Sequence, residues 1–357
     1  MLFRSRTKCE VLSLTPRLLL KAWSRTRERI ERLRPSGDCV AVLLDGLSER
    51  SSEYVRSWFP ESALVEVAGI SSAIAEERDP RIRNLLVLIL SNILRSVSFQ
   101  KDDDLRVRRD ESSAGDTLAV ELYLAQAEKV VSSLSRFLSV ERPPELGEFD
   151  AGEGDARIAD EQLPELRNKV DAIITSPPYA TALPYLDTDR LSLCLLGMLD
   201  REHHRDRDGF MIGNREISEA TRLALWQHFE ENRDALPDTV TKTIDRIYRE
   251  NKKIDVGFRR RNLPALLSKY FFDMQQVFST YTRLLKSGAS AFVVVGNNHT
   301  LAGGKRVEIR TDRYLAELAE MTGLRHVSSL PMEMLVSRDI FKKNAGTAET
   351  IIELSNQ

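Results

Sequence analysis

The sequence contains little cysteine, and its 3 cysteines, Cys9, Cys39 and Cys194, stand far apart. They form no Cys-x-x-Cys pair and have no Cys/His ligand spacing, so the pattern supports neither a zinc site nor a disulfide framework. Long apolar runs are absent too, because the longest, Leu85–Leu90, is far shorter than the roughly 20 residues that a membrane helix requires. The N-terminus lacks the basic, apolar and small-residue order of a signal peptide. We therefore expect a cytoplasmic protein with no bound metal and no membrane segment.

Neither sign of charge is in excess, since 52 Lys and Arg residues nearly balance 54 Asp and Glu residues and leave a net charge of −2. Such a chain does not attract polyanions through its overall field, so contact with one must come from local basic patches. Two stretches qualify, Arg259–Arg261 and Lys101–Asp110. Either can instead be an ordinary solvated charged segment. We expect phosphate contact at Arg259, Arg260 and Arg261 in preference to the second stretch, where Asp102–Asp104 offset the arginines.

The first half of the chain carries helix signals. Thr15-Pro16 and Asp79-Pro80 each combine an N-cap residue with proline at the first helical position. A third helix is expected from Asp116 to about Val140, whereas Val40–Leu44 is a candidate short strand. We expect residues 1–148 to form a helical region that ends in a linker rich in proline and acidic residues.

The second half of the chain alternates between strand and helix patterns. Val170–Thr175 is an apolar run that ends in a Pro-Pro turn, as a buried strand would. Such alternation is typical of a doubly wound α/β sheet. The α/β domain would comprise residues 149–199 and 262–357, and the polar residues 200–261 would be an insertion on the ligand side. The later elements expected are a helix at Asn262–Lys286 ended by Ser287-Gly288, a buried strand at Ala289–Val295, a helix from Thr311 to Gly323, and strands at His326–Leu330 and Thr350–Leu354.

The loop Thr175–Tyr179, TSPPY, follows the first of these strands, where open α/β sheets bind ligands. Its residues suit the methylation of an amine on a nucleic-acid base, whose lone pair is shared with the ring. The Ser176 hydroxyl and the Pro177 carbonyl can accept from the amine, and two prolines hold that carbonyl rigidly. The Tyr179 ring offers a face for a base taken out of its stack. The alternative is a rigid turn without a chemical role.

The segment Asp171–Tyr179, DAIITSPPY, resembles motif IV of the amino-methyltransferases, the N4-cytosine and N6-adenine DNA methylases of restriction–modification systems. The resemblance implies a Rossmann-like class I methyltransferase sheet, S-adenosylmethionine as the cofactor and double-stranded DNA as the substrate. It implies catalytic roles for Ser176, Pro177, Pro178 and Tyr179. In this family, serine directly before the Pro-Pro pair, as at Ser176, favours cytosine N4 as the target, whereas Asp or Asn at that position favours adenine N6. Residues 200–261 would then serve target recognition or DNA contact.

Two residues are candidates for the cofactor site. Gly154-Asp155-Ala156 resembles motif III, in which an acidic or polar side chain accepts from the adenine amine of S-adenosylmethionine. This resemblance makes Asp155 the candidate acceptor, although the same residues can be an acidic linker turn. Thr175, at the end of the expected strand, is the second candidate.

A complete member of this family carries a glycine-rich loop, D-P-F-x-G-x-G, because only glycine lets the backbone approach the methionine part of the cofactor. The sequence has only Gly152-Glu-Gly154, which follows no apolar strand. The start of the chain resembles the helical region after motifs I and II, so the sheet is expected to lack its first strands. Three explanations stay open: a second polypeptide supplies the cofactor half, the reading frame is truncated, or the chain is a non-catalytic remnant. The alternative functions are an adenine-N6 or RNA base methylase and a non-catalytic DNA-binding subunit with a degenerate methylase fold.

Overall fold

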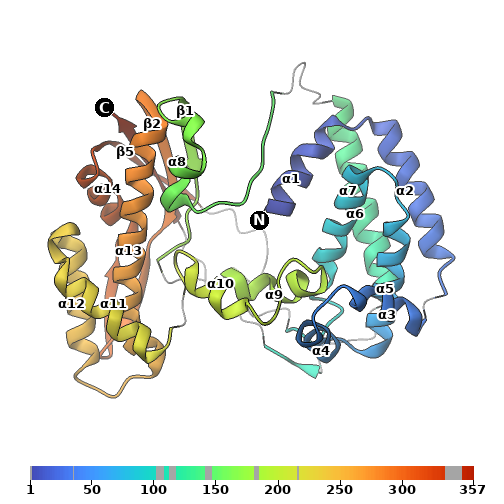
Figure 1. Cartoon of the computed structure of the whole chain (residues 1–357), viewed down its shortest axis with the longest axis horizontal. Helices are drawn as coiled ribbons and strands as arrows, with labels where there is room; N and C mark the ends of the chain where they lie inside the picture. The colour runs from blue at the N-terminus through green and yellow to red at the C-terminus, as the bar shows by residue number, and fades with distance from the viewer. Residues whose placement is uncertain are drawn as a thin grey trace. The chain divides into compact units, whose positions relative to one another are not determined.

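The computed structural model describes residues 2–34, 36–101, 108–111, 118–140, 147–180, 185–214, 217–333 and 348–357. The chain forms two compact units. The first comprises residues 1–153 and 187–204, and the second comprises residues 154–186 and 205–357. Figure 1 shows the first unit as a group of helices and the second as helices around a sheet. Within the described ranges, no helix is both long and apolar enough to cross a membrane.

The first unit is helical, as the sequence predicts. Thr15 caps α2 by accepting a hydrogen bond from the Leu18 amide, and Asp79 caps α6 in the same way through the Arg81 amide. Asp116, the predicted cap of α7, lies outside the described residues. The helices are α1 (Leu2–Glu10), α2 (Pro16–Glu31), α3 (Gly37–Asp45), α4 (Glu49–Trp58), α5 (Glu61–Ala75), α6 (Pro80–Ile93), α7 (Ala119–Val140) and most of α9 (Tyr185–Leu195), with a 3-10 turn at Val11–Ser13.

The strand predicted at Val40–Leu44 is wrong, because these residues lie in the helix α3. Val40 and Leu44 are buried, whereas Val42 between them is 72% exposed. Burial at positions four apart is the spacing of a helix face and not of a strand. A run of five small or apolar residues is too short to show this difference in the sequence alone.

The second unit contains a mixed sheet of 4 strands in the order β1-β2-β6-β5, with β1 parallel to β2 and the other pairs antiparallel. Its strands are β1 (Val170–Thr175), β2 (Leu285–Gly296), β5 (Leu324–Glu333) and β6 (Ala348–Asn356), beside a hairpin of β3 (Asn298–Ala302) and β4 (Lys305–Ile309). Its helices are α8 (Ala159–Gln162), α10 (His204–Phe210, from the last residue of the first unit), α11 (Glu219–Glu231), α12 (Asp238–Asn251), α13 (Phe258–Leu284) and α14 (Thr311–Met321), with 3-10 turns at Ala156–Ile158, Pro164–Leu166 and Arg233–Ala235.

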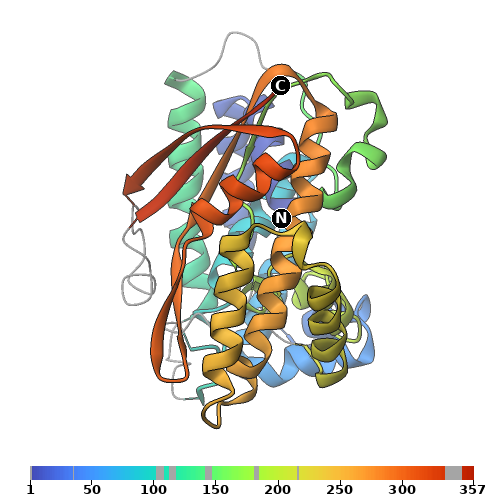
Figure 2. The same cartoon turned by 90° about the vertical axis from the view of Figure 1, so that its left-hand side faces the viewer.

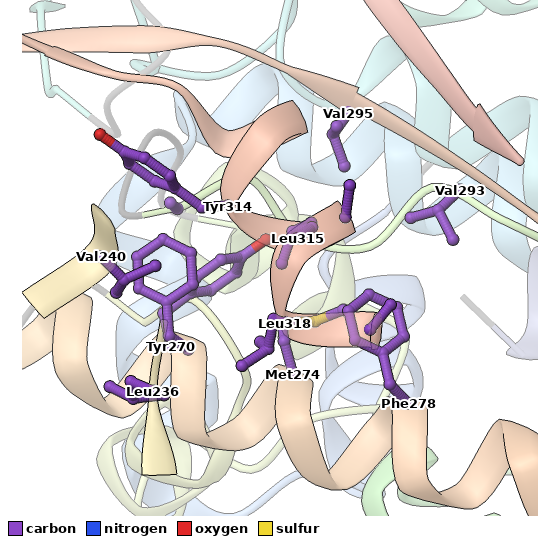
Figure 3. Close-up of a cluster of buried hydrophobic side chains, with 14 of the residues drawn as sticks. Leu236, Val240, Tyr270, Met274, Phe278, Val293, Val295, Tyr314, Leu315 and Leu318 are labelled. Carbon is purple, nitrogen blue, oxygen red and sulfur yellow. The ribbon is translucent and has the colours of Figure 1, made fainter. Parts of the chain in front are cut away.

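The core of the second unit lies between one face of the sheet and the helices α12, α13 and α14. Tyr270, Met274 and Phe278 follow one another along one face of α13 and meet Leu315 and Leu318 of α14 (Figure 3). Val293 and Val295 contribute from β2. The helices α12 and α13 run side by side, in yellow and orange in Figure 2. Residues 200–261, predicted as a polar insertion, therefore supply part of this core, because α12 buries Val240, Ile244 and Ile247 and turns its charged residues outward.

Among the described residues of the second unit, the opposite face of the sheet is the more exposed one. Side chains alternate along a strand, and the strand register places Ile174, Phe292, Ile351, Leu330 and Met332 on this face. Ile174 is 79% exposed and Leu330 is 57% exposed. The prediction that β1 is a buried strand is therefore wrong, although its bounds are correct. β1 is an edge strand of the sheet, and a short apolar run does not reveal how many neighbours the strand has.

Two further predictions differ from the structure. The predicted helix end at Ser287-Gly288 lies inside β2, because β2 begins at Leu285, directly after α13. Gly288 has a φ of +77° within this strand, so the glycine marks an irregularity of the strand and not a helix end. The doubly wound parallel sheet is observed only in part, since one pair of strands is parallel in a sheet that is otherwise antiparallel. The fold is a mixed α/β structure with a helical majority.

Candidate functional site

The loop Thr175–Tyr179 begins at the carboxyl end of β1 and reaches the carboxyl end of β2. Ser176 is exposed, Pro177 is buried, and Pro178 and Tyr179 are half-buried. Since proline has a fixed φ and no N–H, the two prolines limit the conformations available to the loop. The prolines thus restrict the backbone of the loop, and Ser176 is exposed beside them.

Two glycines allow other segments to pack closely on this loop. A Cβ atom at Gly213 would lie 2.9 Å from the Cβ atom of Pro178, and one at Gly296 would lie 3.0 Å from Cε2 of Tyr179. Gly213 also has a φ of +77°, which residues with a side chain rarely adopt. The residue types at 213 and 296 therefore determine where the loop can lie.

Tyr179 and Ala180 make hydrogen bonds to other strands. The Tyr179 hydroxyl donates to Oε1 of Glu349, the second residue of β6. Nδ2 of Asn298 in β3 donates to the Ala180 carbonyl over 2.9 Å. Since Glu349 pairs with Gly296, the Tyr179 ring lies where β2 ends and β6 begins, on the more exposed face of the sheet.

Thr175 points to the other face, toward the core. It pairs with Val293, and its hydroxyl shares a hydrogen bond with the phenol of Tyr281 on α13. Burial raises the pKa of Tyr281 to about 12, and the weaker influence of Thr175 lowers it. Tyr281 is therefore protonated near neutral pH. Thr175, predicted to bind the cofactor, already has a hydrogen-bond partner in the structure.

Asp155 belongs to a compact ion network. Its carboxylate accepts the backbone N–H of Arg157 at 3.0 Å and is paired with the Arg157 guanidinium at 2.8 Å. Arg157 also pairs with Asp273 of α13 at 2.9 Å, and Lys269 pairs with Asp273 at 2.6 Å. Burial favours a higher pKa for Asp155, but the bonds from Arg157 outweigh it and hold the pKa below its usual value. Arg157 thus occupies part of the acceptor capacity that the Asp155 carboxylate could offer to the adenine amine of a cofactor.

Arg259, Arg260 and Arg261 are exposed in the first turn of α13. Because α13 leads directly into β2, its first turn lies at the same end of the sheet as the carboxyl end of β2. Arg261 pairs with Asp255 at 3.6 Å, and the Arg259 guanidinium lies 5.6 Å from the Phe258 ring centroid. Arg261 also donates to the Val256 carbonyl over 3.3 Å, whereas positive charge at a helix N-terminus opposes the helix dipole.

The part of the chain that the structure describes contains no group of three or more His, Cys, Asp or Glu side chains placed to hold a metal ion.

No protein-family model matches the chain. Two curated proteins do match, both called Type II methyltransferase M.AvaI, one from Nostoc sp. (strain PCC 7120 / SAG 25.82 / UTEX 2576) and one from Anabaena variabilis. Each is 30% identical over 164 residues, which is 45% of this chain and 32% of the relative.

The chain is a relative of the DNA methyltransferases of restriction–modification type. This relationship confirms the predicted family resemblance. The matching segment spans about a third of the length of these curated relatives. The roles of the individual site residues stay predictions, as does the division of the chain into a helical region, a catalytic domain and an insertion.

The sequence indicates only some of the residues that hold the loop in place. Gly213, Gly296, Asn298 and Glu349 approach it from other segments, and Glu349 lies 170 positions from Tyr179. Gly296 and Asn298 are indicated because they follow a predicted strand, where they could line the pocket, and a glycine at such a place often marks a close approach by other atoms. Glu349 had no such signal, since it reads as one of several charged residues at a strand end.

Proposed function

We propose that this chain binds a DNA base and presents its exocyclic amine, most favourably cytosine N4, for methylation with S-adenosylmethionine as the methyl donor. The observation that carries the proposal is the loop Ser176–Tyr179, held rigidly at the carboxyl ends of β1 and β2 with the Ser176 hydroxyl exposed. The finer fold assignment, a class I methyltransferase sheet, is supported by the parallel β1–β2 pair joined through α13.

The loop residues would act on the amine itself. Acceptance of its N–H bonds by the Ser176 hydroxyl and the Pro177 carbonyl pulls the nitrogen toward tetrahedral geometry and frees its lone pair. Preorganised acceptors of this kind need no rearrangement during the reaction. Tyr179 provides a stacking surface for the displaced base. When bound, the cofactor would supply an electrophilic methyl group, and the methylated nitrogen would then lose one proton to solvent.

Arg259, Arg260 and Arg261 would contact DNA phosphates. They lie at the loop end of the sheet, and their charge conflicts with the dipole of their own helix. A bound phosphate would resolve this conflict. Double-stranded DNA is therefore the proposed substrate, with residues 200–261 forming part of its contact region.

Much of the donor site would come from outside the described residues, from a second polypeptide or a further segment. Asp155 and Thr175 have side chains bonded to Arg157 and Tyr281, and Gly152-Glu-Gly154 follows no strand. The outer edge of β1, which pairs with no other strand among the described residues, offers a place for an additional strand beside the loop that would hold the base. In doubly wound sheets with the order 3-2-1-4-5-6, the first half joins the second at an edge of this kind.

The test is transfer of a labelled methyl group from S-adenosylmethionine to duplex DNA, by the whole chain alone and together with the product of the adjacent upstream reading frame. Digestion of the DNA to nucleosides separates N4-methylcytosine from N6-methyladenine, and an RNA substrate tests the RNA alternative. Tyr179→Ala should reduce transfer about 10- to 100-fold, because base–aromatic stacking contributes about 1–3 kcal/mol. Specific DNA binding without any transfer, even with the upstream product, would instead support the non-catalytic subunit.

A further inference from the structure

Tyr179 is held from two sides by residues of other strands. Its hydroxyl donates to the Glu349 carboxylate, and its ring lies against the backbone of Gly296, where any Cβ atom would be only 3.0 Å from a ring carbon. Gly296 and Glu349 are direct partners in the β2–β6 ladder. The hydrogen bond and the close contact thus come from one cross-strand pair at the end of the sheet.

We propose that Glu349 is a positioning residue for the methyl-transfer reaction, which fixes the Tyr179 ring and, through its charge, makes the ring a better partner for the reacting amine. The inference rests on the proposed function, since it takes Tyr179 as the surface on which the base stacks. Glu349 does not touch the base; it acts through the phenol.

The geometric part of this role follows from the two rotatable bonds of tyrosine. An unrestrained ring would have to lose rotational freedom each time a base stacks on it. The hydrogen bond from the hydroxyl and the close fit on Gly296 fix the ring before the base arrives. Preorganisation of this kind helps the reaction because the cost of ordering is met during folding.

The electrostatic part follows from the charge on the reacting nitrogen. As the N–C bond forms and the C–S bond breaks, with its electron pair going to sulfur, the amine becomes positive until it loses a proton to solvent. The face of an aromatic ring attracts a cation. A phenol that donates to a carboxylate carries more electron density than one that donates to water, so Glu349 strengthens this attraction at the moment the charge develops.

Glu353 supplies a matched control. It lies four residues further along β6, on the same face of the sheet, but accepts its hydrogen bond from the Ser328 hydroxyl at 3.0 Å. Glu353→Gln removes the same charge from the same strand without affecting Tyr179. If β6 needed only acidic residues for its stability, the two glutamates would respond alike.

The experiment measures kcat and KM for DNA in the active form of the enzyme, for Glu349→Gln, Glu349→Ala, Tyr179→Phe, the double variant Glu349→Ala/Tyr179→Phe and Glu353→Gln. We expect Glu349→Ala to lower kcat about 10-fold, as for loss of a hydrogen bond to a charged group, with a smaller change in KM. Glu349→Gln keeps an acceptor and should lose less. The double variant should be no worse than Tyr179→Phe alone, because both remove the same bond. Glu353→Gln should match the wild type.

A second readout does not depend on activity. With 13C-labelled tyrosine, the Cζ resonance of Tyr179, assigned by its absence in Tyr179→Phe, should shift in Glu349→Gln and stay in place in Glu353→Gln. The inference is overturned if wild-type protein transfers methyl groups and Glu349→Ala does so equally well, or if the effects of the two single variants multiply. If wild-type protein transfers no methyl group under any condition, the proposed function fails, while the resonance still decides whether Glu349 holds Tyr179.

Discussion

Two structural constraints favour glycine at position 213, a backbone conformation and a close contact, and substitutions can distinguish their effects. Its φ of +77° disfavours any side chain, and a Cβ atom there would lie 2.9 Å from Pro178. Gly288 has the same φ of +77°, but a Cβ atom there would meet nothing within 4 Å. The two positions therefore carry the same backbone strain and differ only in the contact with the loop.

We predict that Gly213→Ala and Gly288→Ala each destabilise the protein by about 1–2 kcal/mol through the left-handed backbone conformation. Only Gly213→Ala should also lower methyl transfer, because it displaces Pro178 and with it the acceptors of Ser176 and Pro177. Thermal unfolding measures the first effect and steady-state kinetics the second. Equal activity in the two variants would show that the close approach of Gly213 does not position the loop.

At the scale of single elements, substitutions in the first turn of α13 can show whether its arginines bind DNA or stabilise the fold. Neutral glutamines at Arg259, Arg260 and Arg261 should leave stability unchanged or slightly raise it, because the helix dipole no longer meets positive charge. DNA affinity should fall, and the slope of log affinity against log salt should become shallower by about 0.9 for each phosphate that the protein no longer neutralises. Fluorescence anisotropy with a labelled duplex over a range of salt concentrations measures the DNA affinity and its salt dependence.

Three exposed cations of α12, Lys242, Arg246 and Arg249, provide the control. Their replacement removes the same formal charge from a neighbouring helix but leaves the first turn of α13 intact. If both triple variants change the salt slope equally, the effect comes from net charge and not from a specific contact at Arg259–Arg261.

The sequence predicted where helices and strands begin and end better than it predicted their burial and their neighbours in the fold. Strand β1 was predicted to the residue because charged residues and a Pro-Pro turn enclose its apolar run. Its exposure was not predictable, since an edge strand and a central strand share the same local pattern. The hairpin of β3 and β4 was not predicted, although Gly303-Gly304 connects its strands. Its polar, exposed residues gave no clear apolar alternation.

The candidate site, too, has a part that the sequence predicts and a part that it does not. The loop Thr175–Tyr179 is a local feature whose chemistry the residue types reveal. Its supports, Gly213, Gly296 and Glu349, become neighbours only through the pairing of distant strands and the packing of a separate segment. Asp155 stays a predicted cofactor residue, and the sequence did not indicate that its carboxylate pairs with Arg157, two positions away.

At the scale of the whole molecule, helices of the second unit cover one face of its sheet, and the other face carries exposed apolar side chains among the described residues. Core residues such as Val293 and Ile352 are fully buried, whereas Ile174 and Leu330 on the opposite face are largely exposed. Parallel strands in α/β proteins normally have helices on both faces. An exposed apolar edge strand is also prone to pair with further strands. Both features fit a sheet that receives additional elements beside β1.

This arrangement predicts a specific change in hydrogen exchange. In the chain alone, the β1 amides that point away from β2 should exchange quickly, because an edge strand leaves one row of its N–H groups unpaired. When the product of the upstream reading frame binds and restores methyl transfer, those amides should become protected, since an added strand would pair with them. Strand β5 is the control, because it is the other edge of the same sheet and should exchange unchanged. Protection at β5 in place of β1, or restored methyl transfer with β1 still exchanging quickly, would contradict docking at the β1 edge.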